Sequence, residues 1–487
     1  MPTRLELDLT TGSRPHAAHR QSAGAPLRLL LCGDFSGRAG RGRDEPDGLA
    51  TRPLLRVDVD NLDAVMARLA PAVELTVDGR ICTLGFATLD DFHPDRLLAL
   101  GELQAGLDTA ASPAPAAEAQ ARPAQDATTA ESDAAMLERL LGHAPTAPRA
   151  AASMPTQGSV ATAVDALVRR IVSADAASTA PAEPARFEGA VNAVLAERLR
   201  ALLHDPGFQG LEAAWRSVQL LVSRLALDGE IELHLFDVTR AELAAAAAEP
   251  DLAESGLWKA LVERGDAGWG LLVSLEQFDA SAGDVRLLAT LATTAAAAGG
   301  PIIAGAAPRL FGYTAWPVSV DADDWPPLDA ASAAHWQALR ASPLARWIGL
   351  VAPGLMLRLP YGADTDPIDA FDFDEVAGAD PAQALLRGPA AVACALLAGE
   401  AFQQDGWQLD LDAFLDIDDL PAWVYDDDGE RHLYPVTGAW MGERTATAML
   451  GYGVMPLLSR RDRPAARLLR WQSVAAAASA LAGAWSR

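Results

Sequence analysis

Cysteine is scarce in this sequence, in which Cys32, Cys82 and Cys394 are the three among 487 residues. Their odd number and wide separation exclude a disulfide framework and a cysteine-based zinc site. Because proteins without disulfides are typical of reducing compartments, the sequence predicts a protein of the cytoplasm.

Long apolar runs are also missing. The longest window without a charged residue, residues 287–308, is interrupted by Gly299-Gly300-Pro301. This pattern favours a helix, a turn and a strand over a membrane span. Near the N-terminus, Arg4, Glu6 and Asp8 interrupt any apolar core of a signal peptide. We therefore predict no membrane insertion.

Basic residues are outnumbered: 39 Lys and Arg stand against 65 Asp and Glu, which gives a net charge of −26. An acidic surface repels the phosphates of nucleic acids and of anionic lipids. We therefore exclude nucleic acid as a partner. The balance fits a soluble protein or one that meets basic surfaces.

Catalytic and cofactor-binding motifs are absent. The sequence has no HExxH zinc motif, no GxSxG nucleophile elbow and no GxGxxG dinucleotide loop. The glycine-rich stretch Gly33–Arg43 lacks the Gly-Lys-Ser/Thr ending of a phosphate loop, so we predict a surface loop with several arginines. The Asp-rich tract of residues 410–428 lacks the spacing of a calcium loop and predicts solvated turns. We predict no catalytic, cofactor-binding or metal-ligating residue and do not expect an enzyme.

What the sequence does contain is an aromatic-anchored helix pair over residues 191–225. Asp205 is suited to cap the second helix, and Pro206 suits its first position. The apolar residues of that helix step by three and four, which predicts one buried face: Phe208, Leu211, Trp215, Val218, Val222 and Leu225. Four tryptophans either line a ligand pocket or anchor a core, and the second is favoured: Trp215, Trp269, Trp347 and Trp407.

Residues 1–108 have the pattern of a compact α/β unit. Leu27–Cys32 and Arg56–Asp60 predict strands, and a helix up to Leu69 follows the second. Asp78-Gly79 predicts the turn of a hairpin. A further helix is expected from about residue 91 to residue 107.

Residues 109–184 are rich in Ala, Pro, Ser and Thr, which is typical of a low-complexity linker. Two amphipathic islands interrupt it, Met136–Gly142 and Val160–Val172. Each is either a docking helix for a partner or a transient helix in a tether, and the second is favoured.

From residue 185 onward, strand and helix patterns alternate. Residues 230–236, 268–275 and 301–304 predict strands, with helices at 241–248 and 284–298 between them. This alternation predicts a parallel sheet with helical crossovers. A small-residue helix is expected at 389–402, and a hairpin is expected around Asp426–Glu430.

Motifs in this third region resemble TssC, the large sheath subunit of type VI secretion systems. Residues 202–216, from Leu202-Leu203-His204-Asp205-Pro206 to Trp215-Arg216, are similar to the signature LHHPEFQALEATWRGL. Further similar segments follow in the order of the family: ARWIGL at 345–350, LRLPYG at 357–362 and FDFDE at 371–375. The N-terminal region resembles TssB, the small sheath subunit, through GDFSG at 33–37, residues 56–66 and residues 86–95.

The resemblance implies a TssB–TssC fusion of α/β class, with two mixed α/β domains of contractile tail-sheath type at 1–108 and 185–487. In this family, subunits assemble around a tube of Hcp and exchange strands with their neighbours. The implied partners are copies of this chain, TssB–TssC subunits, the Hcp tube, baseplate proteins and the ClpV ATPase. ClpV engages a short helix that precedes the family's large subunit, where Met136–Gly142 lies in this chain. The implied location is the bacterial cytoplasm.

The TssC-like region ends at Arg487, earlier than in the family. We therefore expect either a component of the contractile sheath or a non-polymerising paralogue that caps a sheath, adapts it to the baseplate or regulates its assembly. An unrelated α/β enzyme is the third alternative, and the missing motifs disfavour it.

Overall fold

The computed structural model describes residues 24–77, 80–100, 183–265, 268–427 and 429–485. Of the described residues, those up to 100 and those from 196 onward form one compact unit. Below, the N-terminal part means residues 24–100 and the C-terminal part means residues 196–485. The sequence suggested two α/β domains, whereas the described residues of both parts share one sheet.

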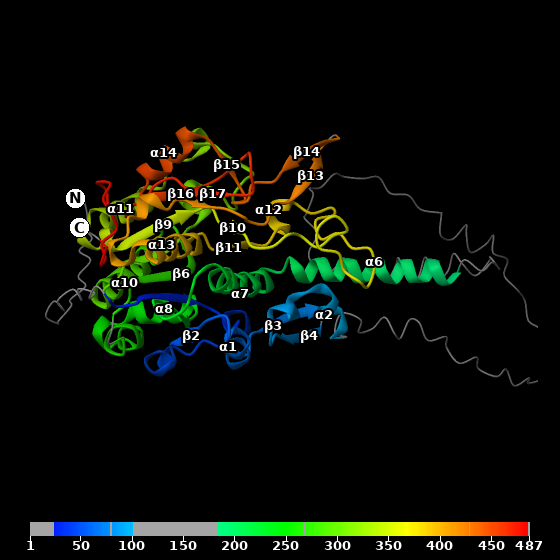
Figure 1. Cartoon of the computed structure of the whole chain (residues 1–487), viewed down its shortest axis with the longest axis horizontal. Helices are drawn as coiled ribbons and strands as arrows, with labels where there is room; N and C mark the ends of the chain where they lie inside the picture. Colours follow the sequence, from blue (N-terminus) through cyan, green and yellow to red (C-terminus); the bar gives the residue numbers. More distant parts are fainter. Residues whose placement is uncertain (1–23, 78–79, 101–182, 266–267, 428, 486–487) are drawn as a thin grey trace, which may run out of the picture. The chain divides into compact units, whose positions relative to one another are not determined.

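This mixed sheet has nine strands in the order β12-β17-β16-β9-β7-β6-β1-β5-β2 (Figure 1). The strands from β16 to β5 are all parallel, and both edges of the sheet are antiparallel. The parallel centre confirms the predicted sheet with crossovers and the α/β class. The strand bounds are β1 Leu27–Gly33, β2 Leu55–Val57, β5 Ile231–Asp237, β6 Leu271–Phe278, β7 Ile302–Ala306, β9 Ile348–Ala352, β12 Asp416–Ile417, β16 Val454–Ser459 and β17 Ala466–Leu468.

Strand β1 explains why the two parts fold together. It lies between β5 and β6 of the C-terminal part, with Leu29 opposite Leu233 on one side and Leu271 on the other. Every residue of β1 except Arg28 is buried. A strand that is hydrogen-bonded on both edges and covered on both faces is typically a continuous apolar run, and LRLLLC is apolar apart from Arg28.

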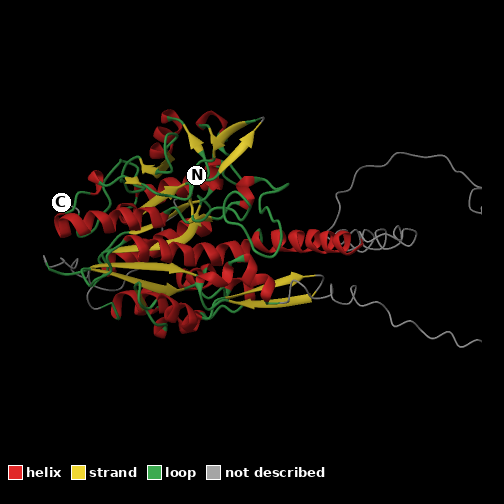
Figure 2. Ribbon diagram, turned by 45° about the vertical axis from the view of Figure 1, so that its right-hand side comes forward, coloured by secondary structure: helices red, strands yellow, loops and turns green. Residues whose placement is uncertain are grey.

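Helices cover both faces of the sheet (Figures 1 and 2). On one face, α8 (Arg240–Ala248) and α11 (Ala330–Ala341) each pack on α10 (Ala282–Ala298). α13 (Ala391–Asp405) lies on the other face against β1, β6, β7 and β9, and α7 (Pro206–Arg224) packs on α13. The small side chains of α13 allow this close approach, as the sequence predicted.

The helix corner also follows the prediction. α6 (Glu183–Leu203) ends before Asp205, whose carboxylate accepts hydrogen bonds from the N–H groups of Gly207 (2.9 Å) and Phe208 (3.0 Å). Pro206 occupies the first position of α7. The predicted apolar face of α7 is buried, and Trp215 is fully inaccessible to solvent.

The described N-terminal part contains two α-helices, three short 3-10 helices and a hairpin besides β1 and β2. α1 (Leu62–Leu69) precedes the hairpin of β3 (Ala72–Val77) and β4 (Arg80–Gly85), which the Asp78-Gly79 turn predicted. α2 (Pro94–Ala99) follows. The rest of the helix that we predicted there, residues 101–107, lies outside the described residues.

One central strand was missed. No strand was predicted at 348–352, where the fully buried β9 directly follows a 3-10 turn at Pro343–Trp347. The remaining elements are α9 Gly256–Trp258, α12 Pro381–Ala384, α14 Glu443–Gly451, β8 Ser319–Val320, β10 Leu355–Met356, β11 Arg387–Gly388, β13 Val424–Asp427, β14 Glu430–Leu433 and β15 Trp440–Met441. β13 and β14 confirm the second predicted hairpin.

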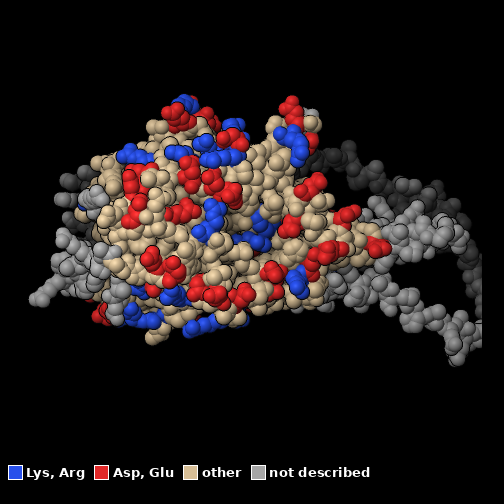
Figure 3. All heavy atoms as spheres, viewed as in Figure 1, with Lys and Arg blue, Asp and Glu red and all other residues tan. Residues whose placement is uncertain are grey.

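Among the described residues, no helix is both long enough and apolar enough to cross a lipid bilayer. On the face drawn in Figure 3, acidic and basic side chains are interspersed.

Candidate functional site

The loop after β1 is the first contact between the two parts. The Asp34 carboxylate accepts hydrogen bonds from the backbone N–H groups of Arg38 and Ala39, both at 2.8 Å. Gly37 within this turn has a φ of 70°, and a Cβ there would lie 2.3 Å from the carbonyl oxygen of Ala72. The turn therefore requires glycine at this position.

This loop turns into the protein. The Nε1 of Trp215 donates a 2.8 Å hydrogen bond to the carbonyl of Phe35. The hydroxyl of Ser36 donates to the Asp237 carboxylate at 2.9 Å, and the Ser36 N–H donates to the same group at 3.1 Å. The predicted surface loop was therefore wrong for Ser36 and Arg38. The sequence shows the arginine but not the carboxylates that face it.

The carboxylates that face Arg38 belong to Asp237 and Glu242 of the C-terminal part. We call Glu242 together with Arg38 and Arg52 the Glu242 cluster. Arg38 Nη1 lies 2.8 Å and Arg52 Nη1 lies 2.5 Å from the Glu242 carboxylate, which is fully buried. The backbone N–H groups of Glu45 (2.7 Å) and Thr239 (3.0 Å) also donate to it. The N-terminal part thus supplies most of the donors for a carboxylate of the C-terminal part.

Burial alone would raise the pKa of Glu242. Hydrogen bonds from Arg52 and from the N–H groups of Thr239 and Glu45, with the charge of Arg38, outweigh burial and lower the pKa below its usual value. Glu242 is therefore ionised in the folded protein at neutral pH. One feature of the sequence points to a structural role for Glu242. Thr239 and Glu242 have the T-x-x-E spacing of a capping box at the start of α8.

Two further contacts hold the parts together. Phe86 and Phe92 stack at 4.2 Å between ring centroids, and both meet Phe208 of α7 edge-on. Asp95 accepts hydrogen bonds from the N–H groups of Asp369 and Ala370 at 3.1 and 3.3 Å. All the N-terminal residues in these contacts lie in the TssB-like motif at 86–95.

A second buried set of charges lies within the C-terminal part, and we call it the Arg358 cluster: Arg358 with Glu212 and Glu375. Arg358 Nε lies 2.8 Å from Glu212, and its Nη1 lies 2.7 Å from Glu375. Both carboxylates have no exposed surface. The three residues come from three of the motifs that carry the resemblance to TssC.

Neighbours complete the Arg358 cluster. Arg216 donates to Glu212 at 2.6 Å, and the N–H of Tyr361 donates to Glu375 at 2.8 Å. Burial would raise the pKa of Glu212, but the charges of Arg358 and Arg216 lower it. These charges are matched and hydrogen-bonded, so the cluster joins α7 to the segment after β10.

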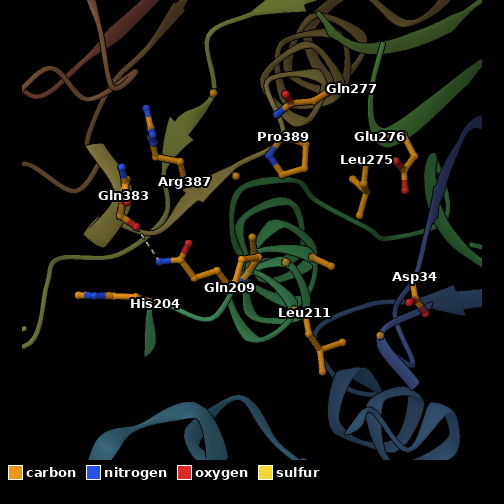
Figure 4. A pocket seen from close by; sticks show the side chains of 18 of the residues that line it. Asp34, His204, Gln209, Leu211, Leu275, Glu276, Gln277, Gln383, Arg387 and Pro389 are labelled. Atoms are coloured by element: carbon orange, nitrogen blue, oxygen red, sulfur yellow. Dashed lines mark hydrogen bonds between the residues drawn. The ribbon is translucent and has the colours of Figure 1, made fainter. Parts of the chain in front are cut away.

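A cavity of about 790 Å³ lies beside the first turns of α7. Figure 4 shows Asp34 and Glu276 toward one side of it and His204 and Arg387 toward the other. The Asp34 oxygens already accept backbone hydrogen bonds, and Glu276 pairs with Arg240 at 3.2 Å. On the other side, His204 Nε2 and Arg387 Nη1 are buried and have no hydrogen-bond partner.

The structure also describes several of the other residues that the sequence analysis considered as candidate site residues. No group of His, Cys, Asp or Glu in the described ranges is arranged to hold a metal ion. Trp215 and Trp269 are core residues, while Trp347 and Trp407 are half-buried. Met136–Gly142 and Val160–Val172 lie outside the described residues.

Comparison with known proteins matches both parts to sheath families. Residues 189–475 match the family described as EvpB/VC_A0108, tail sheath N-terminal domain. Residues 13–105 match the family described as Type VI secretion system, VipA, VC_A0107 or Hcp2. A relative from Pseudomonas aeruginosa, the type VI secretion system sheath protein TssC1, is 28% identical over 298 residues.

That alignment covers 58% of this chain and 60% of the relative, so the chain spans about 60% of the relative's length. The match to the tail sheath family alone covers more than half of the chain and includes every residue of the Arg358 cluster. The match to the VipA family contains β1, Arg38, Arg52 and Asp95, the residues through which the N-terminal part joins the sheet. The chain belongs to the EvpB/VC_A0108 tail sheath family of type VI secretion systems, with a VipA-family region ahead of it in the same chain.

Proposed function

We propose that the chain is a structural subunit of a type VI secretion contractile sheath, with the N-terminal part in the role of the small subunit and the C-terminal part in that of the large one. The observation that carries this proposal is the shared sheet. β1, from the region that matches the VipA family, is hydrogen-bonded between two strands of the region that matches the tail sheath family. Because a central strand holds the two regions together, this arrangement is suited to a subunit in which both regions stay associated.

In this proposal the subunits surround an Hcp-type tube in the bacterial cytoplasm and act without catalysis. Further copies of the chain, TssB–TssC subunits and baseplate proteins are the proposed neighbours. The proposed regions are 1–108 for the small-subunit role, 109–184 for the linker and 185–487 for the large-subunit role.

Negative-stain microscopy of the purified full chain, with and without Hcp, tests this function. Tubes or cogwheel-shaped rings are expected. The double variant Arg38→Ala/Arg52→Ala should lose them, because it leaves Glu242 buried without its cations. Arg309→Ala, at an exposed position, is the matched control and should assemble normally. A native chain that stays monomeric and does not bind TssB–TssC would contradict the proposal.

We also propose that ClpV engages Met136–Gly142. Deletion of residues 136–142 should remove ClpV binding in a pull-down while assembly continues. Deletion of residues 112–118, of the same length and within the same proposed linker, should leave ClpV binding intact. Equal binding by both deletion variants would contradict this role for the segment.

A further inference from the structure

Arg387, the first residue of β11, carries a charge that no carboxylate of the described residues neutralises. Its Nη1 is buried and has no hydrogen-bond partner, and its Nη2 donates to the carbonyl of Ala382. Asp380 acts on it electrostatically but forms no ion pair with it; the Asp380 carboxylate instead accepts a 2.9 Å hydrogen bond from the N–H of Ala382. The guanidinium is thus largely buried with its charge unpaired.

The surroundings of this guanidinium leave room for it but offer it no acceptor. Gly438 has a φ of 80°, and a Cβ there would lie 2.6 Å from Arg387 Nη1, so a larger residue would displace the guanidinium. Tyr434 is buried nearby, and its Oη also has no hydrogen-bond partner. Burial raises the pKa of Tyr434 and the charge of Arg387 lowers it, which places the two groups close together. Two donors, one of them positively charged, are therefore buried without an acceptor.

An unpaired buried guanidinium favours the binding of an anion. Burial lowers the pKa of Arg387 against the effects of Tyr434 and Asp380, but a guanidinium remains protonated in proteins and cannot escape its charge. A buried charge without a partner is strongly destabilising. An anion that pairs with Arg387 removes this cost, so part of the binding energy is already stored in the free protein.

The cavity of about 790 Å³ gives such an anion access, because Arg387 is one of the residues that line it. Nη1 itself is buried, so an anion in the cavity reaches it when the guanidinium turns toward the cavity. His204 lies toward the same side in Figure 4, and its Nε2 is a second buried polar atom without a partner. Unsatisfied polar groups therefore gather on this side of the cavity.

The lining also limits the chemistry of the ligand. A planar guanidinium fork matches a carboxylate in bidentate geometry. Apolar side chains line the cavity, among them Leu211 and Trp316, and suit an apolar body. Asp34 and Glu276 lie toward the other side in Figure 4, so a second negative charge on the ligand would be repelled. These features favour a single carboxylate on an apolar body.

We propose that this cavity binds an organic monocarboxylate, which Arg387 holds after its guanidinium turns into the cavity. The carboxylate belongs to a small molecule or to an acidic side chain of a polypeptide, and the chemistry at Arg387 is the same for both. This site does not depend on the sheath function proposed above, because it lies within one copy of the chain.

Isothermal titration calorimetry of the full chain with hexanoate tests the site. Hexanol has the same apolar body without the charge, and hexylammonium carries the opposite charge, so both are matched controls at the same ionic strength. Hexanoate should bind with a dissociation constant of about millimolar or lower for a ligand of its size. It should bind at least about tenfold more tightly than either control, because they lack the charged hydrogen bonds. Equal binding of hexanoate and hexanol would overturn the inference.

Two substitutions of Arg387 separate a binding role from a structural one. Arg387→Met should abolish hexanoate binding without lowering the melting temperature of the free protein, since it removes an unpaired buried charge and keeps an apolar stem. Arg387→Lys keeps the charge but loses the fork, so binding should weaken about tenfold. Arg309→Met, at an exposed position, should change neither property. Unchanged hexanoate binding by Arg387→Met, or a large fall in its melting temperature, would overturn the inference.

A capped pentapeptide with one central glutamate identifies the source of the carboxylate, and the same peptide with glutamine is its control. Tighter binding of the glutamate peptide than of hexanoate would identify an acidic side chain of a polypeptide. Tighter binding of hexanoate would identify a small molecule. Binding of neither would overturn the site and leave the sheath function untouched.

Discussion

The Glu242 cluster and the Arg358 cluster are built in opposite senses. The first surrounds one carboxylate with two arginines from the other part of the chain, whereas the second surrounds one arginine with two carboxylates from its own part. The side chains of Arg38 and Arg52 keep 12% and 9% exposure, but Glu212 and Glu375 keep none. Removing the central group should therefore be more costly in the Arg358 cluster, because its remaining charges have no path to water.

Arg358→Met gives the largest expected effect. It leaves Glu212 and Glu375 buried side by side, so the free energy of unfolding should fall by about 4–5 kcal/mol. Urea denaturation followed by circular dichroism measures this change. Arg309→Met, at an exposed position, should change stability by less than about 0.5 kcal/mol. A loss below about 1 kcal/mol for Arg358→Met would show that the two carboxylates find other partners or protons.

Trp215→Ala tests the helix that lies between the clusters. α7 carries Glu212 of one cluster, and Trp215 donates to Phe35, close to Arg38 of the other. Truncation of a buried tryptophan costs about 3–5 kcal/mol, here with loss of the hydrogen bond to Phe35. Trp215→Phe should lower stability much less, because phenylalanine loses the hydrogen bond to Phe35 but fills most of the volume of the tryptophan side chain. Equal melting temperatures for native protein and Trp215→Ala would contradict this placement.

Glu242→Gln should cost less than Arg358→Met, about 2–3 kcal/mol, because a buried charged acceptor is lost while both arginines can turn toward water. Calorimetry of the full chain measures the effect. If the loss equals or exceeds that of Arg358→Met, the ranking of the two clusters by access to water is wrong. Limited proteolysis should also cut the N-terminal part faster in this variant than in Arg309→Ala.

Acid should weaken the neighbourhood of the Arg358 cluster. Burial lowers the pKa of His204, and the charges of Arg358 and Arg200 lower it further against the opposing charge of Glu375. The unfolded chain binds its proton near pH 6.5 and the folded chain only at lower pH, so stability is complete above about pH 6.5 and declines as the pH falls below it. Urea denaturation at several pH values should show this decline. His204→Gln should reduce the slope, and an unchanged slope would exclude His204 as a source.

The smallest effect is expected in the N-terminal part, away from both clusters. Ala70 ends α1 with a φ of 47°, a left-handed conformation that costs an L-residue about 1–2 kcal/mol and glycine little. Ala70→Gly should raise the free energy of unfolding by about 1 kcal/mol, after allowance for the greater freedom of glycine in the unfolded chain. Denaturation curves of native and variant protein measure the gain. A loss of stability would mean that the Ala70 methyl group makes a needed contact.

Much of the fold follows from local patterns in the sequence. The caps, the paired strands of the two hairpins and the apolar face of α7 depend on neighbouring residues, and the structure has them where the spacing predicts. β9 was missed because five apolar residues directly after a turn carry no period of their own. The Glu242 cluster could not be predicted, since Arg52 and Glu242 lie 190 positions apart and an ion pair leaves no periodic trace. The position of β1 within the sheet could not be predicted for the same reason. Its pairing partners lie some 200 residues or more away in the sequence, and the whole fold determines which strands pair.

The central place of β1 has a consequence for synthesis. The ribosome completes this strand at residue 33, but its neighbours β5 and β6 are complete only at residues 237 and 278. At about 5–20 residues per second, the strand waits roughly 10–50 s for its partners. During that interval LRLLLC is an apolar strand with free edges, open to pairing with other nascent chains. Slow translation or loss of ribosome-associated chaperones should therefore reduce the yield of this protein more than that of one whose central strands are made consecutively.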